Sequence, residues 1–143
     1  MLNSEILDYI REQRLCVLAV EMLDGSPHAA LVHFAHQENP LIFVIQTNPN
    51  SRKAELISVG REARVSLVIG LEEVPNGKDK TLQIDGVAKL VQSDEVLSRI
   101  YLDKFAENTG QWDDHIYLSV KPVRWRYTAW NGPGKKPLII ENA

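Results

Sequence analysis

Short apolar runs joined by tight turns are the feature of this sequence that most restricts its fold. The dipeptide Asp24-Gly25, which supplies the positive φ angles of a tight hairpin, separates an apolar run at residues 15–22 from a second at 27–37. A turn at residues 38–40 then leads to residues 41–45, whose branched and aromatic side chains favour a buried strand. Strands connected by such turns pair antiparallel, because a parallel pair needs a long crossover between its strands.

The rest of the chain adds three short helices and further strands. Asn3 or Ser4 is placed to cap a first helix, a second covers residues 54–59 and ends at Gly60, and Ser93 is placed to cap a third. The third helix is expected to bury one stripe, formed by Val96, Leu97, Ile100, Tyr101 and Phe105. The remaining strands are predicted at residues 64–71, 82–90, 115–121 and 123–130. These seven strands predict an α+β, mainly β fold, namely one antiparallel barrel with short flanking helices.

A single domain over residues 1–143 is expected, with a core over 1–132 and a tail over 133–143. The chain is 44% hydrophobic, which suits one compact core. The tail has no predicted role in that core, and its apolar residues 138–140 are available to pack on a partner.

Composition argues against several function classes. The formal net charge of −3 argues against a surface built to bind nucleic acid. No apolar run reaches the roughly 20 residues that span a bilayer, so we expect no membrane interaction. The first residues lack the layout of a signal peptide, and we therefore expect a cytoplasmic protein. Cys16 lies in an apolar run, which predicts a buried, reduced thiol, and a lone cysteine forms no disulfide within the chain.

The segment at residues 47–53 lies between a buried strand and the predicted second helix, and it concentrates groups that bind phosphate. The hydroxyls of Thr47 and Ser51 can donate to phosphate oxygens, as can free backbone amides at a helix start. Arg52 adds a planar fork of donors and Lys53 a compact charge. From the residues alone two readings stay open: a phosphate site, or a solvated helix start with ordinary surface cations. A Walker loop is excluded because its glycine pattern is missing.

Three histidines stand close together in the second apolar run, but their spacing does not suit a metal site. Alternation along a strand places His33 on the face opposite to His28 and His36. His28 and His36 are eight residues apart, roughly 26 Å along an extended strand. We expect structural or ligand-lining roles, with a single haem-ligating histidine as the alternative.

Three pieces of the sequence together resemble the pyridoxamine 5'-phosphate oxidase-like, FMN-binding split-barrel family. Residues 43–56 are similar to the family's strand-Thr-Asn-x-x-Ser-Arg-Lys segment. Residues 82–95 are similar to the strand that precedes its second main helix, and residues 122–132 to the closing strand, where a Trp approaches the flavin from the partner subunit. The resemblance implies an antiparallel split β-barrel.

The resemblance also implies a homodimer with two FMN sites, each shared by both subunits. Thr47, Arg52 and Lys53 match the residues that hold the FMN phosphate in that family, with Ser51 beside them. Trp130 matches the aromatic residue that reaches the flavin across the interface.

Four further residues are expected to contact the cofactor. His33 and Gln46 lie on two strands that can wall the ring system, which makes them ring or ribityl contacts. Thr81 stands where the oxidases have a glutamine that reaches FMN across the interface, and neighbouring Gln83 is the alternative for that contact.

Two departures from the family pattern bear on the substrate. The oxidases end in an Arg-Leu-His-Asp-Arg-like segment that binds pyridoxal phosphate, whereas residues 133–137 here read Pro-Gly-Lys-Lys-Pro. Phe105 stands where the substrate motif has an arginine, four residues after a tyrosine. We therefore expect an FMN-dependent oxidoreductase, with a small-molecule electron donor or acceptor, that does not act on pyridoxamine phosphate. No catalytic side chain is identified. The alternatives are a non-catalytic flavin carrier or sensor, a haem- or deazaflavin-binding split barrel, and an interaction module with a vacant pocket.

Overall fold

The computed structural model describes residues 2–70, 77–91, 95–108 and 115–142. The strands are β1 (Leu15–Glu21), β2 (Pro27–His33), β3 (Ala35–Glu38), β4 (Leu41–Thr47), β5 (Ala63–Ile69), β6 (Lys80–Val91), β7 (Ile116–Ala129) and β8 (Leu138–Glu141). The helices are α1 (Ser4–Glu12) and α2 (Glu95–Lys104), with three 3₁₀ turns, η1 (Arg52–Ala54), η2 (Ile57–Val59) and η3 (Ala106–Asn108). No helix in the described ranges is long and apolar enough to cross a membrane.

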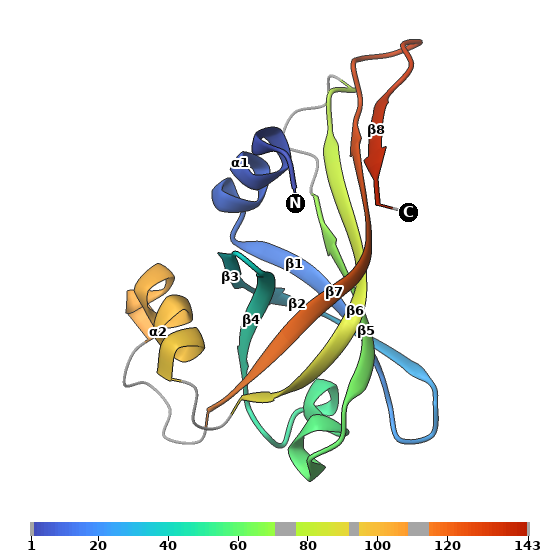
Figure 1. Ribbon diagram of the computed structural model, residues 1–143. Helices are drawn as coiled ribbons and strands as arrows, with labels where there is room; N and C mark the ends of the chain where they lie inside the picture. Colours follow the sequence, from blue (N-terminus) through green and yellow to red (C-terminus); the bar gives the residue numbers. More distant parts are fainter. Residues whose placement is uncertain (1, 71–76, 92–94, 109–114, 143) are drawn as a thin grey trace.

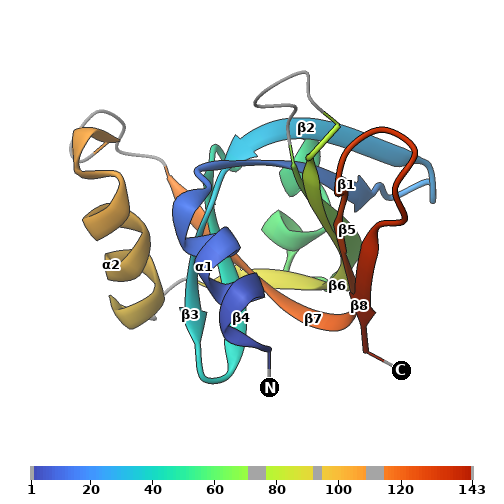
Figure 2. The ribbon, with the colours of Figure 1, turned by 90° about the horizontal axis from the view of Figure 1, so that it is seen from above.

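All described strands form one antiparallel sheet that curls into a half-barrel (Figures 1 and 2). Its strand order is β2-β1-β5-β6-β7-β4-β3, and β8 pairs separately with β7. Helix α1 lies over one end of the curl, whereas α2 stands to the side, against β3 and β4 (Figure 2). The prediction of a mainly β, antiparallel barrel with short flanking helices is confirmed.

Helix α1 forms for the reasons that its sequence suggests. The Asn3 side-chain oxygen accepts a hydrogen bond from the amide of Ile6, which caps the first turn as predicted. Ile6 and Ile10 are fully buried in the main core inside the curled sheet. The Tyr9 hydroxyl donates to the Lys80 carbonyl at 2.8 Å, and this bond joins the helix to the start of β6.

The predicted second strand, at residues 27–37, is divided in two. The chain leaves β2 after His33 and enters β3 at Ala35, and Phe34 between them is fully buried against Phe43. The Phe34 amide donates to the Arg14 carbonyl, outside the sheet ladder. The break lets β2 pair with β1 on one edge of the sheet while β3 pairs with β4 on the other.

The predicted short second helix, at residues 54–59, is present in the 3₁₀ form and starts two residues earlier. Residues 52–59 form the 3₁₀ turns η1 and η2, in which amides bond to carbonyls three residues back, as from Ala54 to Ser51 and from Gly60 to Ile57. A segment this short gains few α-helical bonds, so burial of Ala54, Leu56 and Ile57 decides its shape. Gly60 ends it with φ +80°, as expected for a left-handed cap.

The two predicted closing strands are one continuous strand, β7, which passes through Pro122. A register shift lies opposite, at Asp85/Gly86, where Gly86 pairs with Pro122. A bulge tolerates proline because the ladder is locally interrupted there. Its extra residue reverses the alternation, so that Val120 points into the core before it and Tyr127 after it.

The tail contains a strand that the sequence did not reveal. Strand β8 pairs with β7, from Arg126 opposite Glu141 to Ala129 opposite Leu138. Beyond it, Asn142 hydrogen-bonds with the backbone of Trp125. The end of the described chain is therefore attached to the outside of the barrel.

A second, smaller core lies under α2. It consists of Ala35, Val44, Leu97, Tyr101 and Phe105. Four of the five residues predicted for the buried stripe of α2 face this core. The fifth, Val96, is 65% exposed and lies outside the stripe. The predicted Ser93 cap lies outside the described residues.

Candidate functional site

The segment after β4 brings two predicted site hydroxyls into contact. Thr47 is the last residue of β4 and is only 4% exposed, and its Oγ1 lies 2.9 Å from the Ser51 Oγ. The Ser51 hydroxyl donates to the Asn48 carbonyl at 2.7 Å, and the Asn48 side chain accepts from the Asn50 amide. These local bonds hold the turn in which both hydroxyls lie.

Arg52 and Lys53 follow at once, and neither forms an ion pair within the described part of the chain. Arg52 is exposed and Lys53 half-buried. Partial burial lowers the pKa of the Lys53 ammonium, because a charge is less well solvated there. Arg52 and Lys53, beside the hydroxyls of Thr47 and Ser51, thus form a local patch of positive charge. The net charge of the whole chain, by contrast, is −3.

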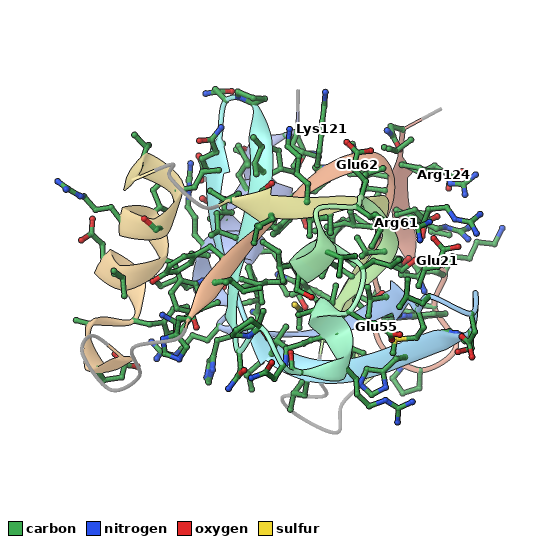
Figure 3. The ribbon with its side chains drawn as sticks, turned by 90° about the horizontal axis from the view of Figure 1, so that it is seen from below. Glu21, Glu55, Arg61, Glu62, Lys121 and Arg124 are labelled. Carbon is green, nitrogen blue, oxygen red and sulfur yellow. The ribbon has the colours of Figure 1, made fainter. Side chains whose placement is uncertain are left out.

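A cavity of about 650 Å³ lies between this segment and the β1–β2 hairpin, and Ser51 and Arg52 line it. Two carboxylates, those of Asp24 and Glu55, line it as well. Figure 3 shows Glu55 on the 3₁₀ segment, on the side that faces the hairpin. Hydrogen bonds from Ser26 lower the pKa of Asp24, with a smaller contribution from the Arg52 charge. The two carboxylates therefore disfavour a phosphate in the middle of this cavity.

His33 and Gln46 both lie beside the aromatic side chains of the α2 core. The His33 ring is exposed, and its centroid lies 5.0 Å from that of Phe105. The Gln46 side-chain amide donates to the Tyr117 hydroxyl at 3.0 Å, and Tyr117 packs edge-on against Tyr101. The structure thus places these two predicted contacts along one side of the barrel, under α2.

Two cations in this region were not found from the sequence. The Arg14 guanidinium lies 4.7 Å from the centre of the Phe105 ring, and the Lys104 Nζ lies 4.4 Å from that of Phe34. Burial lowers the pKa of Lys104 to about 8, although its ammonium donates to the Gln13 carbonyl at 2.6 Å. These contacts join residues up to 91 positions apart, and no local pattern signals them.

Thr81, Gln83 and Trp130 lie at the other end of the sheet. Thr81 pairs with Thr128 on β7, whereas Thr47 pairs with Ile116. Twelve residues of β7 separate these two positions, which corresponds to roughly 40 Å along an extended strand. Within one chain, therefore, the structure does not bring the predicted set together.

The residues at this second end are open to solvent. Gln83 is exposed and lines a cavity of about 370 Å³, with Arg126 beside it. Trp130 is 47% exposed, and its amide donates to the Asp79 carbonyl. These side chains are accessible to a second molecule.

Comparison with known proteins gives one sequence match and a group of similar structures. The family described as pyridoxamine 5'-phosphate oxidase matches residues 2–130. Among curated protein sequences, none matches the chain.

Solved structures with the same fold come from several bacteria. A haem binding protein from Mycobacterium smegmatis has a TM-score of 0.71 and 17% sequence identity, and the match covers 100% of this chain and 60% of that one. The haem storage protein HutZ from Vibrio cholerae has a TM-score of 0.67 and 19% identity, over 92% of this chain and 96% of that one. General Stress Protein 26 from Bacillus anthracis has a TM-score of 0.65 and 15% identity, over 95% and 96%. The chain thus spans about three fifths of the Mycobacterium smegmatis protein and nearly the whole of the other two.

Proposed function

Because the chain belongs to the pyridoxamine 5'-phosphate oxidase family, we propose that it binds FMN in a site shared by two copies and acts as a flavin-dependent oxidoreductase. The phosphate is held by Thr47, Ser51, Arg52 and Lys53. His33 and Gln46 line the ring or ribityl chain on the same copy. Thr81 or Gln83, together with Trp130, approaches from the second copy.

The arrangement of the phosphate-binding segment carries this proposal. The buried Thr47 hydroxyl touches Ser51, and the two neighbouring cations have no ion-pair partner in the described residues. A phosphate dianion would supply the missing counter-charge, through a fork from Arg52 and a point charge from Lys53. Both hydroxyl groups have acceptors within the protein, so each would turn its proton toward the phosphate when it binds.

The separation of the predicted residues supports a two-copy site. Thr47 and Thr81 are too far apart on one sheet to contact one flavin, whereas a second copy can bring its own Thr81, Gln83 and Trp130 to the first copy's phosphate segment. An apolar face for such contact exists on β2, β1 and β5, where Leu31 is 60% exposed. Val17 pairs with both Leu31 and Val68, and these two valines are also more than one third exposed.

When bound, FMN supplies hydride and electron transfer, and the chain's own residues bind and orient it. The donor or acceptor is proposed to be a small molecule that reaches the ring beside α2. Arg14 and Lys104 stand near Phe105 there, but both are already engaged, Arg14 with Glu107 and Lys104 with Gln13. The arginine and the C-terminal segment by which the oxidases hold pyridoxamine phosphate are absent from the sequence, so we propose a different substrate.

Haem binding is the second candidate function, because two of the similar structures are haem proteins by name. An exposed histidine, His33, is available in this chain to ligate iron. His36 is less suitable, since it already contacts the Glu38 carboxylate at 2.9 Å. A deazaflavin cofactor and a non-catalytic flavin carrier are further alternatives that the same measurements separate.

An absorption spectrum of the purified protein, after adding ligand and removing what is free, tests the proposal. We expect retention of FMN and not of riboflavin, because the phosphate carries the interaction with Arg52 and Lys53. The double variant Arg52→Ala with Lys53→Ala is expected to lose FMN, whereas Lys135→Ala with Lys136→Ala, two exposed lysines in the tail, serves as the matched control. Equal retention of FMN by both double variants would refute the site. A Soret band after addition of haemin, with no FMN retained, would favour the haem candidate.

Bound flavin would still leave catalysis to be shown. Rapid reduction by a nicotinamide nucleotide, followed by reoxidation with an acceptor, supports an oxidoreductase. Flavin that resists reduction supports a carrier or sensor.

A further inference from the structure

A second cavity, of about 630 Å³, lies at the other end of β4 and shares no lining residue with the phosphate segment. We call it the end groove. Its apolar wall includes Leu2, from the start of the chain, Leu41 at the start of β4, and Trp125 on β7. All three are partly buried and pack on the main core. The volume falls within the range of small-molecule sites in proteins.

Polar groups gather on one side of the end groove. Lys89 pairs with Ser119 across β6 and β7, and Lys121 lies two residues further along β7 on the same face. Neither lysine forms an ion pair or a hydrogen bond in the described ranges. Figure 3 shows Lys121 beside the tip of the β3–β4 hairpin. Two free ammonium groups therefore border one apolar groove.

A buried serine, Ser119, also lines the groove. Its side chain is one of two polar or charged ones classed as buried in the described residues, with 6% exposure. The other, Thr47, bonds to Ser51, whereas the Ser119 hydroxyl takes part in no hydrogen bond of the described part of the chain and lines the groove. No buried side-chain nitrogen or oxygen of the described residues lacks a partner, so the Ser119 hydroxyl is open to the groove, where a ligand can exchange hydrogen bonds with it.

The acidic group in the groove does not neutralise the lysines. Glu38 also lines the groove, but its carboxylate is held by Arg11 and by His36. These bonds hold the pKa of Glu38 at about 2, so its charge is already compensated by Arg11. The charge left over at the groove is that of Lys89 and Lys121.

The C-terminal tail completes the wall. The Asn142 side-chain oxygen accepts from the Trp125 amide at 2.7 Å, and its amide group donates to the Val123 carbonyl. Asn142 thereby spans the bulge of β7 at the edge of the groove. Leu2 and Asn142, at the two ends of the described chain, thus both line this cavity.

We propose that the end groove binds an amphiphilic monocarboxylate, with its carboxylate between Lys89, Lys121 and the Ser119 hydroxyl and its apolar body on Leu2, Leu41 and Trp125. Two point charges and one hydroxyl suit the two oxygens of a carboxylate, whereas phosphate recognition usually adds the planar fork of an arginine. The site is separate from the flavin site and does not depend on it.

Calorimetric titration of the purified protein with decanoate, below its micelle concentration, tests this site. Decanol has the same chain without the charge and is expected to bind at least about tenfold more weakly. Lys89→Ala with Lys121→Ala should weaken decanoate binding by about tenfold or more, and Lys135→Ala with Lys136→Ala should leave it unchanged. Both pairs of lysines are exposed, so neither change threatens the fold.

Ser119→Ala separates a ligand contact from a structural role. It should weaken decanoate binding several-fold, yet leave the unfolding temperature of the free protein nearly unchanged, because the Ser119 hydroxyl bonds to no other group in the described residues. Equal affinity for decanoate and decanol, wild-type affinity in the Lys89/Lys121 variant, or no measurable heat with decanoate would each overturn the proposal. Retention of FMN, measured in parallel, should be the same in all of these variants.

Discussion

The Thr47 Oγ1 and the Ser51 Oγ lie 2.9 Å apart, where β4 ends and the 3₁₀ turns begin. Thr47 is buried, so its hydroxyl has a fixed position, while Ser51 is half-buried and borders the neighbouring cavity. A rigid strand therefore ends in a polar pair that leads directly to Arg52 and Lys53.

Thr47→Val keeps the size of the side chain and removes its hydroxyl. We expect the dissociation constant of FMN to rise roughly ten- to a hundredfold, because a hydrogen bond to a charged group is worth about 1.5–3 kcal/mol. Quenching of FMN fluorescence on binding provides the measurement. Riboflavin serves as the control ligand, and its weak binding should not change. An FMN affinity equal to wild type would remove Thr47 from the phosphate site.

Cys16 should be unreactive in the folded protein. Its side chain is 2% exposed, and burial raises the pKa of its thiol from 9.0 to about 12. The folded state therefore holds the thiol proton more tightly than the unfolded state does. The contribution to stability is fully present below pH 9 and is lost as the pH rises from 9 toward 12.

Two measurements check this behaviour. At pH 8, a thiol reagent such as dithionitrobenzoate should label Cys16 only in denaturant. The free energy of unfolding should fall between pH 9 and 11 by at most about 1.4 kcal/mol per pH unit, and by less in Cys16→Ala. Rapid labelling without denaturant would contradict the burial.

Local sequence was enough to predict the elements whose causes lie in neighbouring residues. Asn3 caps α1 through a bond to Ile6, three residues on, and Gly25 turns the first hairpin with φ +84°. The contact between Thr47 and Ser51 spans only four residues, but the sequence predicted each hydroxyl as a phosphate donor and not their mutual contact. For the remaining site residues the sequence predicted which residues are candidates, but not where they lie relative to one another.

Long-range contacts account for what could not be predicted. From its local sequence Pro122 predicts a strand break. Strand β7 nevertheless continues, because Gly86 on β6, 36 residues earlier, pairs with Pro122. The positions of Thr81 and Trp130, far from Thr47, follow from strand pairing that spans the whole sheet. The groups around Ser119 likewise come from both ends of the chain.

Gly86→Ala should destabilise the fold. A Cβ at this position would lie 2.5 Å from the Lys121 carbonyl oxygen, a backbone atom that cannot turn away. We expect a loss of about 1–3 kcal/mol or more in the free energy of unfolding by urea. Val87→Ala, at the next residue, is the control and should cost less because Val87 is only half-buried. Stability equal to wild type would mean that the two strands do not approach closely at the bulge.

Mixing two variants that each bind FMN poorly tests whether one flavin site uses residues of two copies. Arg52→Ala with Lys53→Ala removes the phosphate cations, and Gln83→Ala with Trp130→Ala removes the side chains at the far end of the sheet. Each variant alone should bind FMN poorly. In an equimolar mixture, half of the dimers combine one chain of each kind, and each of these has one intact site out of two.

The mixture should therefore recover about a quarter of the wild-type FMN capacity, given random exchange between symmetric dimers. Different affinity tags on the two variants allow the mixed dimers to be purified and their bound flavin counted. Recovery would require Arg52 and Trp130 of one site to come from different copies. Mixed dimers without flavin would mean that both groups serve the same copy. Full FMN retention by one variant alone would mean that its substituted residues do not touch the cofactor, and a monomer in sedimentation would exclude the shared site altogether.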